Sequence, residues 1–378
     1  SFKDASVGKL DIVTDSPLTD GKTYYKFYIW IDGNNENNET MQGKNLKGTL
    51  NVDVSTPPVN AVTLVEGLDK GETGDSGSGV YKVTHDAITA GSSATGSEIP
   101  AVTDYRYYGP NPNNYICLDM EGQSTCPDKH LYRIIGSIYE EKENTNRIKV
   151  IKATPLTDGT TKGYAWDSGN VNIWATITNG NYSNSLTSGS QLMKLLNSGA
   201  WWNGTSGSYY NNSTTATTVN FTNYKLSDKA KSYITTSRYY LGGYNNNPPI
   251  TNEMYGYERG TLRYNTDRPL YWEGMVGLMY PSDYGYAAGN TCVTGTKLYD
   301  YEGGCMNKDW LYISNTYQWL MSPFSGNSDY AFYVYSSGYV YNYGSVNSAC
   351  SARPVFYLNS SASISEGEGT SAAPYILS

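Results

Sequence analysis

Leu131-Tyr132-Arg133-Ile134-Ile135-Gly136 precedes a second apolar run, Arg147-Ile148-Lys149-Val150-Ile151-Lys152. Both runs are short and rich in β-branched residues, which is typical of two strands that pair as a hairpin. Similar strand-like runs alternate with turns from about residue 105 onward. Leucine spacing and capping residues also favour helices over 188–197 and 227–234. We therefore predict an α+β fold in which strands dominate.

The composition limits the function classes. The chain has 378 residues, a formal net charge of -8 and a pI of about 4.9. An acidic chain lacks the positive surface of a nucleic-acid-binding protein, so no nucleic-acid partner is expected. No stretch approaches the roughly 20 apolar residues of a membrane-spanning helix. Gly, Asn, Ser, Thr and Tyr abound, which indicates a β-rich, loop-rich protein that is extracellular or on the cell surface.

The first residues are Ser1-Phe2-Lys3-Asp4, without an initiator Met or a signal peptide. We expect a processed form that contacted a membrane only through a removed anchor. The chain contains five Cys. Cys117 lies close to Cys126 in the sequence, and Cys292 lies close to Cys305. Two local disulfides are therefore expected, in an oxidising compartment, and Cys350 is left over.

Three regions differ in character. Residues 1–56 contain strand-like runs such as Tyr24-Tyr25-Lys26-Phe27-Tyr28-Ile29-Trp30-Ile31 and are predicted as a small β module. Residues 57–104 are rich in Gly, Ser and Thr and are predicted as a connector that contains a short helix or strand around Val80-Tyr81-Lys82-Val83. Aromatic residues become more frequent over 105–378, which we predict to be the main domain.

Tyr accounts for 38 residues, and the densest cluster is Tyr330-Ala331-Phe332-Tyr333-Val334-Tyr335-Ser336-Ser337-Gly338-Tyr339-Val340-Tyr341-Asn342-Tyr343-Gly344-Ser345. Binding paratopes favour the same residue types, because Tyr gives rigid contact area and Ser, Gly and Asn give adaptable hydrogen bonds. Alternate residues of a strand point to opposite faces, so only part of the cluster can contact a ligand. The residues expected to face the core are Phe332, Val334, Val340 and Val346.

An ordered series of motifs covers residues 105–378. It includes Tyr105-Arg106-Tyr107-Tyr108-Gly109-Pro110, Gly277-Leu278-Met279-Tyr280-Pro281-Ser282-Asp283-Tyr284-Gly285-Tyr286-Ala287, Trp319-Leu320-Met321-Ser322-Pro323 and Arg353-Pro354-Val355-Phe356-Tyr357-Leu358. This series resembles a family of exported surface proteins of gut Firmicutes and Mollicutes relatives that look like C-type-lectin-fold modules. The resemblance implies a C-type-lectin-like domain preceded by a small β-sandwich-like module.

Residues 330–351 are similar to the segment that diversity-generating retroelements mutagenise in variable proteins of the C-type-lectin fold. In those proteins Asn codons are altered, which would also account for Cys350. The resemblance implies a binding face for a protein or glycan on another cell or a phage. The expected ligand-contact residues are Tyr333, Tyr335, Tyr339, Tyr341, Asn342, Tyr343, Ser345 and Asn347, with Trp201 and Trp202 of a polar loop as further candidates.

The first module suggests an alternative. Met41-Gln42-Gly43-Lys44 and Lys47-Gly48-Thr49-Leu50 look like the closing strands of TasA/camelysin-type β-sandwich proteins, which form extracellular fibres. On this reading the chain is a structural subunit of an extracellular filament or pilus-like matrix, and it self-assembles through the N-terminal module.

Catalytic patterns are scarce, so we expect no enzyme. The only two His, His85 and His130, are predicted as surface residues outside any Ser-His-Asp arrangement. No cofactor is expected. Calcium is an alternative, because Asp167, Asp283 and Asp329 lie beside aromatic residues and Gly, where carboxylates can bind Ca²⁺.

Overall fold

The computed structural model describes residues 57–166, 190–210, 216–264, 269–327 and 329–378. The β module predicted over 1–56 lies outside the described residues, as does Asp167. Thr56–Ser378 forms one compact unit of mixed helices and strands, which confirms the α+β class. None of the helices within these ranges is long and apolar enough to cross a membrane.

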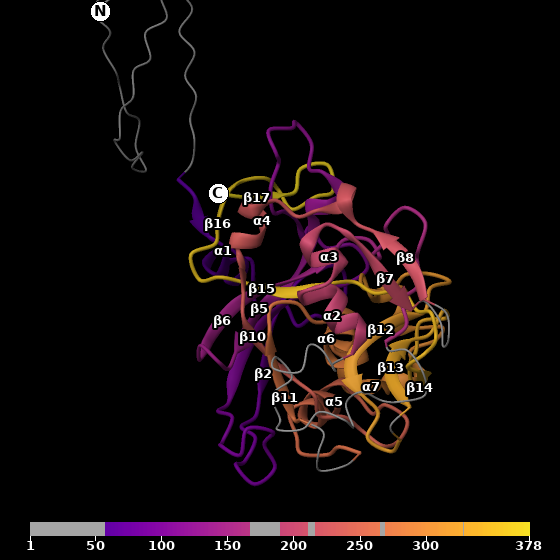
Figure 1. The fold of residues 1–378 in the computed structure, drawn as a ribbon. Helices are drawn as coiled ribbons and strands as arrows, with labels where there is room; N and C mark the ends of the chain where they lie inside the picture. Colours follow the sequence, from indigo (N-terminus) through magenta and orange to yellow (C-terminus); the bar gives the residue numbers. More distant parts are fainter. Residues whose placement is uncertain (1–56, 167–189, 211–215, 265–268, 328) are drawn as a thin grey trace, which may run out of the picture. The chain divides into compact units, whose positions relative to one another are not determined.

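The main sheet has ten strands within the described ranges, and the hairpin predicted from the sequence lies inside it (Figure 1). Strands β5 (Leu131–Glu140) and β6 (Thr145–Lys152) pair antiparallel, which confirms the hairpin. Nearly all of β5 is buried, because the sheet is covered on both faces there. The other strands are β1 (Val59–Asn60), β2 (Gly79–His85), β3 (Val102–Tyr108), β4 (Tyr115–Cys117), β9 (Ile234–Thr235), β15 (Val355–Leu358), β16 (Ser363–Glu366) and β17 (Tyr375–Leu377).

The strand order is β1-β16-β17-β4-β5-β6-β15-β9, with β3 also paired to β5 and β2 to β3. Strands β17 and β4 run parallel, and the other pairs are antiparallel. The first and last parts of the described chain meet in this sheet, because Val59 pairs with Ile364.

The structure differs from the prediction of a connector over 57–104. This span contains α1 (Ala61–Gly67), which begins where the Asn60 side chain accepts from the amides of Val62 and Thr63. It also contains β2, all of whose residues pair with β3. The short helix or strand predicted around Val80-Tyr81-Lys82-Val83 is therefore a strand, and it is longer than expected because it pairs along its whole length with β3.

Smaller sheets and short helices complete the unit. The small sheets pair β7 (Ser206–Tyr210) with β8 (Ala216–Asn220), β10 (Ser237–Tyr240) with β11 (Tyr271–Gly274), and β12 (Gln318–Pro323) with β13 (Tyr330–Val334) and β14 (Val340–Ser345). The helices are α2 (Gln191–Asn197), α3 (Ala200–Asn203), α4 (Asp228–Ser232), α5 (Thr251–Glu258), α6 (Pro281–Ala287) and α7 (Asn290–Gly295).

Both predicted helices are confirmed, with shorter bounds. The Ser190 hydroxyl caps α2 by accepting from the Met193 amide at 3.5 Å, two residues after the predicted start at Ser188. The Ser227 hydroxyl caps α4 by accepting from the Ala230 amide at 3.0 Å. These caps satisfy amides that would otherwise have no partner in the first turn.

Helix α6 begins inside a buried network of charges. The Asp283 carboxylate accepts from Arg106 Nη1 of β3 at 3.0 Å and from Lys149 Nζ of β6 at 2.5 Å. It also accepts from the Tyr280 amide at 2.9 Å and so closes the first turn of the helix. Arg106 in turn donates to Asp104 at 2.7 Å. All these charged side chains are at most 1% exposed, so each depends on its partners in place of water.

The same helix is joined to the small sheet β12–β13–β14. The Tyr284 hydroxyl donates to the Gly338 carbonyl at 2.7 Å, in the turn between β13 and β14. The Met321 amide of β12 donates to the Met279 carbonyl at 2.8 Å, just before α6. Figure 1 shows α6 beside β12. Helix α6 therefore connects the charge network of the main sheet with the small sheet.

Replacing Asp283 by Asn should lower the free energy of unfolding by about 3–5 kcal/mol, because the change leaves Lys149 and Arg106 buried without their shared counter-charge. Urea unfolding of the full chain measures this. The matched control is Asp300→Asn at an exposed carboxylate, which should cost less than about 0.5 kcal/mol. Equal losses in the two variants would contradict the role given to Asp283.

Acid should weaken the same network. Burial alone would raise the pKa of Asp283, but Lys149 and Arg106 outweigh burial and hold this pKa below its usual value. The folded chain then binds fewer protons at this site than the unfolded chain, so the stabilisation is complete above about pH 4 and is lost as the pH falls further. Urea unfolding from pH 7 to pH 3 should show a shallower acid loss for Asp283→Asn than for the parent chain. Parallel curves would contradict the assignment.

Candidate functional site

The Tyr-rich segment forms β13, the following turn and β14, in a sheet with β12. Tyr333 of β13 lies opposite Tyr341 of β14 on one side and Trp319 of β12 on the other. Trp319-Leu320-Met321 is buried, although β12 is an edge strand of this sheet. The Trp319 indole donates to the Tyr164 carbonyl at 2.7 Å and so fixes β12 to the rest of the unit.

One face of the sheet points into the core. Phe332, Val334, Val340 and Val346 are each at most 1% exposed, as the alternation predicted. Asn342 is two residues after Val340 on the same strand and is 0% exposed. It therefore belongs to the inner face, and the prediction that it contacts a ligand is wrong. Neither polar atom of its amide has a hydrogen-bond partner among the described residues.

The other face carries a continuous layer of aromatic rings, which we call the tyrosine face. Its members are Tyr299, Tyr317, Tyr330, Tyr333, Tyr335, Tyr339, Tyr341 and Tyr343. Tyr335 and Tyr339 are stacked with centroids 4.8 Å apart, and Tyr341 packs against Tyr343 at 5.6 Å. Such edge-to-face and offset contacts are favourable beyond the area they bury.

Exposure varies across this face. Tyr333 is only 8% exposed and packs against Trp319 at 6.0 Å, so it belongs largely to the layer beneath. Tyr317 and Tyr343 are 41% and 46% exposed. Tyr335, Tyr339 and Tyr341 are half-buried between them. The accessible surface is therefore centred on Tyr317, Tyr341 and Tyr343 rather than on Tyr333.

The turn that carries Tyr335 and Tyr339 is fixed by backbone hydrogen bonds and by packing against Met306. The Tyr335 amide donates to the Tyr339 carbonyl and the Gly338 amide to the Tyr335 carbonyl, each at 2.8 Å. Gly338 has φ +93°, and a Cβ there would lie 2.5 Å from the Met306 Cβ. Only Gly fits this turn, so its geometry is fixed by the backbone and by Met306.

The tyrosine face is a neutral surface. Burial raises the pKa of Tyr339 to about 12, and Tyr335 and Tyr299 add to the rise. Burial likewise holds the pKa of Tyr333 well above its usual value. The carboxylate of exposed Glu302 acts electrostatically on Tyr335 and Tyr339 from the edge. The Tyr333 and Tyr339 phenols can therefore donate and accept hydrogen bonds at neutral pH without carrying charge.

Ser345 is the last residue of β14 and Asn347 lies just after it, and both are half-buried. The Ser345 hydroxyl donates to Asn347 Oδ1 at 2.8 Å. Tyr299, Tyr317 and Tyr330 extend the face beyond the predicted residues. Tyr317 stands two positions before Trp319, so strand alternation could have identified it.

The structure corrects the prediction for Trp201 and Trp202. They lie on helix α3 and not in a polar loop. Trp201 is 2% exposed and belongs to the core. Trp202 is half-buried, with its ring 6.4 Å from Trp201 and 5.0 Å from Lys231 Nζ. Trp201 is thus used for packing, and Trp202 keeps part of its ring accessible.

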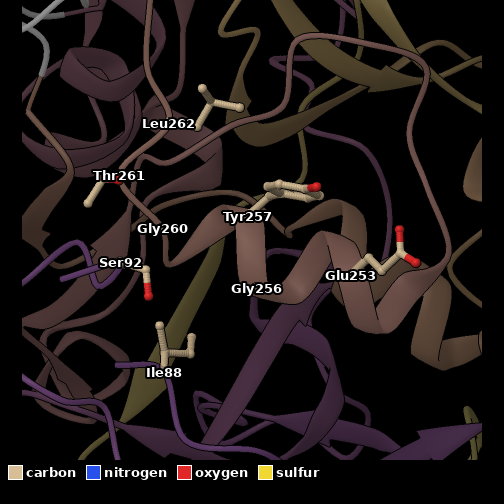
Figure 2. A pocket seen from close by; sticks show the side chains of 8 residues that line it. All are labelled: Ile88, Ser92, Glu253, Gly256, Tyr257, Gly260, Thr261 and Leu262. Atoms are coloured by element: carbon tan, nitrogen blue, oxygen red, sulfur yellow. The ribbon is translucent and has the colours of Figure 1, made fainter. Parts of the chain in front are cut away.

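A groove of about 410 Å³ lies elsewhere, along α5 (Figure 2). Glu253 and Tyr257 of α5 line it, together with Ile88 and Ser92 from the segment after β2. It contains none of the residues predicted to bind a ligand.

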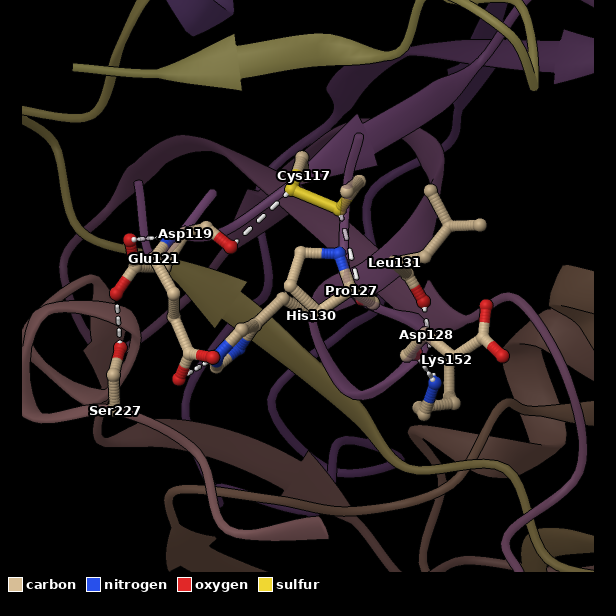
Figure 3. Close-up of a disulfide and its surroundings, with 10 residues drawn as sticks. Cys117, Asp119, Glu121, Pro127, Asp128, His130, Leu131, Lys152 and Ser227 are labelled. Atoms are coloured by element: carbon tan, nitrogen blue, oxygen red, sulfur yellow. Dashed lines mark hydrogen bonds and ion pairs between the residues drawn. A yellow bond between two sulfur atoms is a disulfide. The ribbon is translucent and has the colours of Figure 1, made fainter. Parts of the chain in front are cut away.

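Both predicted disulfides form, Cys117–Cys126 and Cys292–Cys305, while Cys350 is free and buried. Figure 3 shows the first disulfide beside His130, whose Nε2 lies 3.1 Å from Glu121 Oε1.

The prediction of surface His residues is wrong. His130 is 0% exposed, and His85 is 6% exposed, with its Nε2 2.9 Å from Asp104 Oδ2.

Of the carboxylates considered for Ca²⁺, Asp167 lies outside the described residues. Asp283 is occupied by Arg106 and Lys149. Over the part of the chain that the structure describes, no group of three or more His, Cys, Asp or Glu side chains is placed to hold a metal ion.

Comparison with known proteins gives no relative: no family model, no curated protein and no solved structure matches the chain.

The packing of the face depends on a missing side chain at Gly344. A Cβ there would lie 2.6 Å from Tyr333 Cδ1 and 2.7 Å from Trp319 Cζ3. Gly344→Ala should lower the free energy of unfolding by about 1–3 kcal/mol through overpacking, with a changed near-ultraviolet circular dichroism spectrum. The control is Gly295→Ala, where no atom lies within 4 Å of the added Cβ. Unchanged stability in Gly344→Ala would contradict the packing described.

Proposed function

We propose that the chain is a non-enzymatic binding protein whose ligand contacts the tyrosine face. The observation that carries the proposal is the continuous layer of neutral aromatic rings, which is exposed at Tyr317 and Tyr343. Rigid aromatic side chains lose little conformational entropy on binding and offer both apolar area and a hydroxyl group. The partner is a protein or a glycan on another cell or a phage.

The separation of the two faces of the sheet supports this function. Phe332, Val334 and Val340 bury the inner face, whereas Tyr341 and Tyr343 project outward. Substitution on the outer face therefore removes little core packing. Such an arrangement suits the C-type-lectin-like, retroelement-diversified scaffold that the sequence resembles, and the two disulfides are compatible with secretion.

Replacing Tyr317, Tyr341 and Tyr343 together by Ser should abolish binding and leave the chain folded. Hot-spot aromatics typically contribute at least about 2 kcal/mol each, so a loss of more than a hundredfold in affinity is expected. Arrays of glycans and of displayed surface proteins, probed with the parent chain, supply the ligand for this measurement.

The control for the triple variant is Tyr224→Ser, Tyr264→Ser and Tyr271→Ser together, at tyrosines outside the tyrosine face that are half-buried or exposed. The control should bind like the parent. Binding that survives in the Tyr317, Tyr341 and Tyr343 variant, or ordered polymers of the parent chain in electron micrographs in place of ligand binding, would contradict the proposal.

A further inference from the structure

The groove along α5 has a chemistry of its own. Glu253 is exposed and has no hydrogen-bond or ion-pair partner among the described residues. The carbonyl oxygens of Gly256, Tyr257 and Ser92 lie 3.2, 3.4 and 3.6 Å from the position that a Cβ of Gly260 would take. The Gly256 and Tyr257 carbonyls lie at the C-terminal end of α5, where the helix dipole is negative, and the Ser92 carbonyl belongs to the segment after β2. The Glu253 carboxylate and the partial negative charges of these carbonyl oxygens therefore border the same groove.

Hydrogen-bond donors are scarce in the groove. The Ser92 hydroxyl is engaged with Thr89, at 2.7 Å from its hydroxyl and 3.2 Å from its carbonyl. The Tyr257 hydroxyl is bonded to Tyr244. Ile88 and Leu262 supply apolar walls. The Thr261 hydroxyl also lines the groove and can donate or accept. The Glu253 carboxylate would repel an anion and attract a cation, from which the hydroxyl and carbonyl oxygens can also accept.

The Tyr257 ring adds a surface for a cation. It packs against Tyr244 with centroids 4.3 Å apart, and this contact holds the ring in place. The same chain already sets cations over tyrosine rings elsewhere, as with Arg259 over Tyr255 at 3.5 Å. A ring next to a carboxylate is the combination that retains ammonium groups.

Gly256 keeps the groove open. It lies inside α5, where Gly is less favourable than Ala. No atom lies within 4 Å of a Cβ added at this position, so packing does not require Gly here. A larger side chain at 256 would extend into free space beside Glu253 and Tyr257 (Figure 2).

We propose that this groove binds an alkylammonium group, the chemistry of a lysine side chain, with the ammonium at Glu253 and the alkyl chain along Tyr257, Ile88 and Leu262. The site shares no lining residue with the tyrosine face, so it does not depend on the function proposed for that face.

Saturation-transfer NMR of the full chain at low salt tests the site with three probes of one length: pentylammonium, pentanol and pentanoate. Pentylammonium should bind about tenfold more tightly than pentanol, equivalent to one charge-assisted contact, and pentanoate should not bind. Glu253→Gln should remove the preference for the amine, whereas the control Glu366→Gln, at another exposed carboxylate, should keep it. Equal binding of amine and alcohol by the parent chain would overturn the proposal, as would an unchanged preference in Glu253→Gln.

A second variant fills the groove without removing charge. Gly256→Leu should abolish binding of both pentylammonium and pentanol and keep a melting temperature at or above that of the parent chain. The control is Gly67→Leu, at the end of α1, where a Cβ likewise meets no atom within 4 Å. Pentylammonium binding that persists in folded Gly256→Leu would place the amine elsewhere and overturn the proposal.

Discussion

The carboxylate of Asp283 is the contact on which the arrangement of the molecule depends. It is buried with Arg106 of β3 and Lys149 of β6 and also closes the first turn of α6. A charge so far from water is tolerated only when its partners are in place, so the network fixes the position of α6 against the main sheet. Tyr284, one residue later, donates to the turn between β13 and β14. By fixing α6, the charge network thus also fixes the position of the tyrosine face relative to the main sheet.

This arrangement divides the molecule into a fixed part and a part that is free to change. The inner face of the small sheet, with Phe332 and Val340, belongs to the core. The outer face is held by contacts between aromatic rings. It is also held by the turn at Gly338, whose geometry is set by the backbone and by the close packing of Met306. A binding surface built in this way can vary its side chains while the backbone stays in place. The groove at Glu253 is a second surface of different chemistry, suited to a cation.

The sequence predicted the elements whose signal is local. Strand alternation predicts the hairpin of β5 and β6 and the inward residues of β13 and β14. Capping and residue spacing predict the helices α2 and α4 and the two disulfides. For β2 the sequence leaves helix and strand open around Val80–Val83, because the partner strand β3 lies beyond a long polar loop. Asn342 was placed outside because residue type suggested a contact residue, whereas strand alternation puts it beside Val340 and Phe332. Trp201 is buried by the helix that its surroundings did not indicate. The charge network could not be predicted, since Arg106, Lys149 and Asp283 meet only in the folded chain.

Site-saturation mutagenesis of the displayed full chain, scored by protease resistance, tests the central claim that the outer tyrosines serve binding and the inner residues serve folding. Tyr317, Tyr341 and Tyr343 should accept most polar substitutions without loss of protease resistance. Phe332, Val334 and Val340 should reject nearly all of them. If the outer tyrosines prove as intolerant as the inner residues, they are part of the core and the tyrosine face is not a separable binding surface.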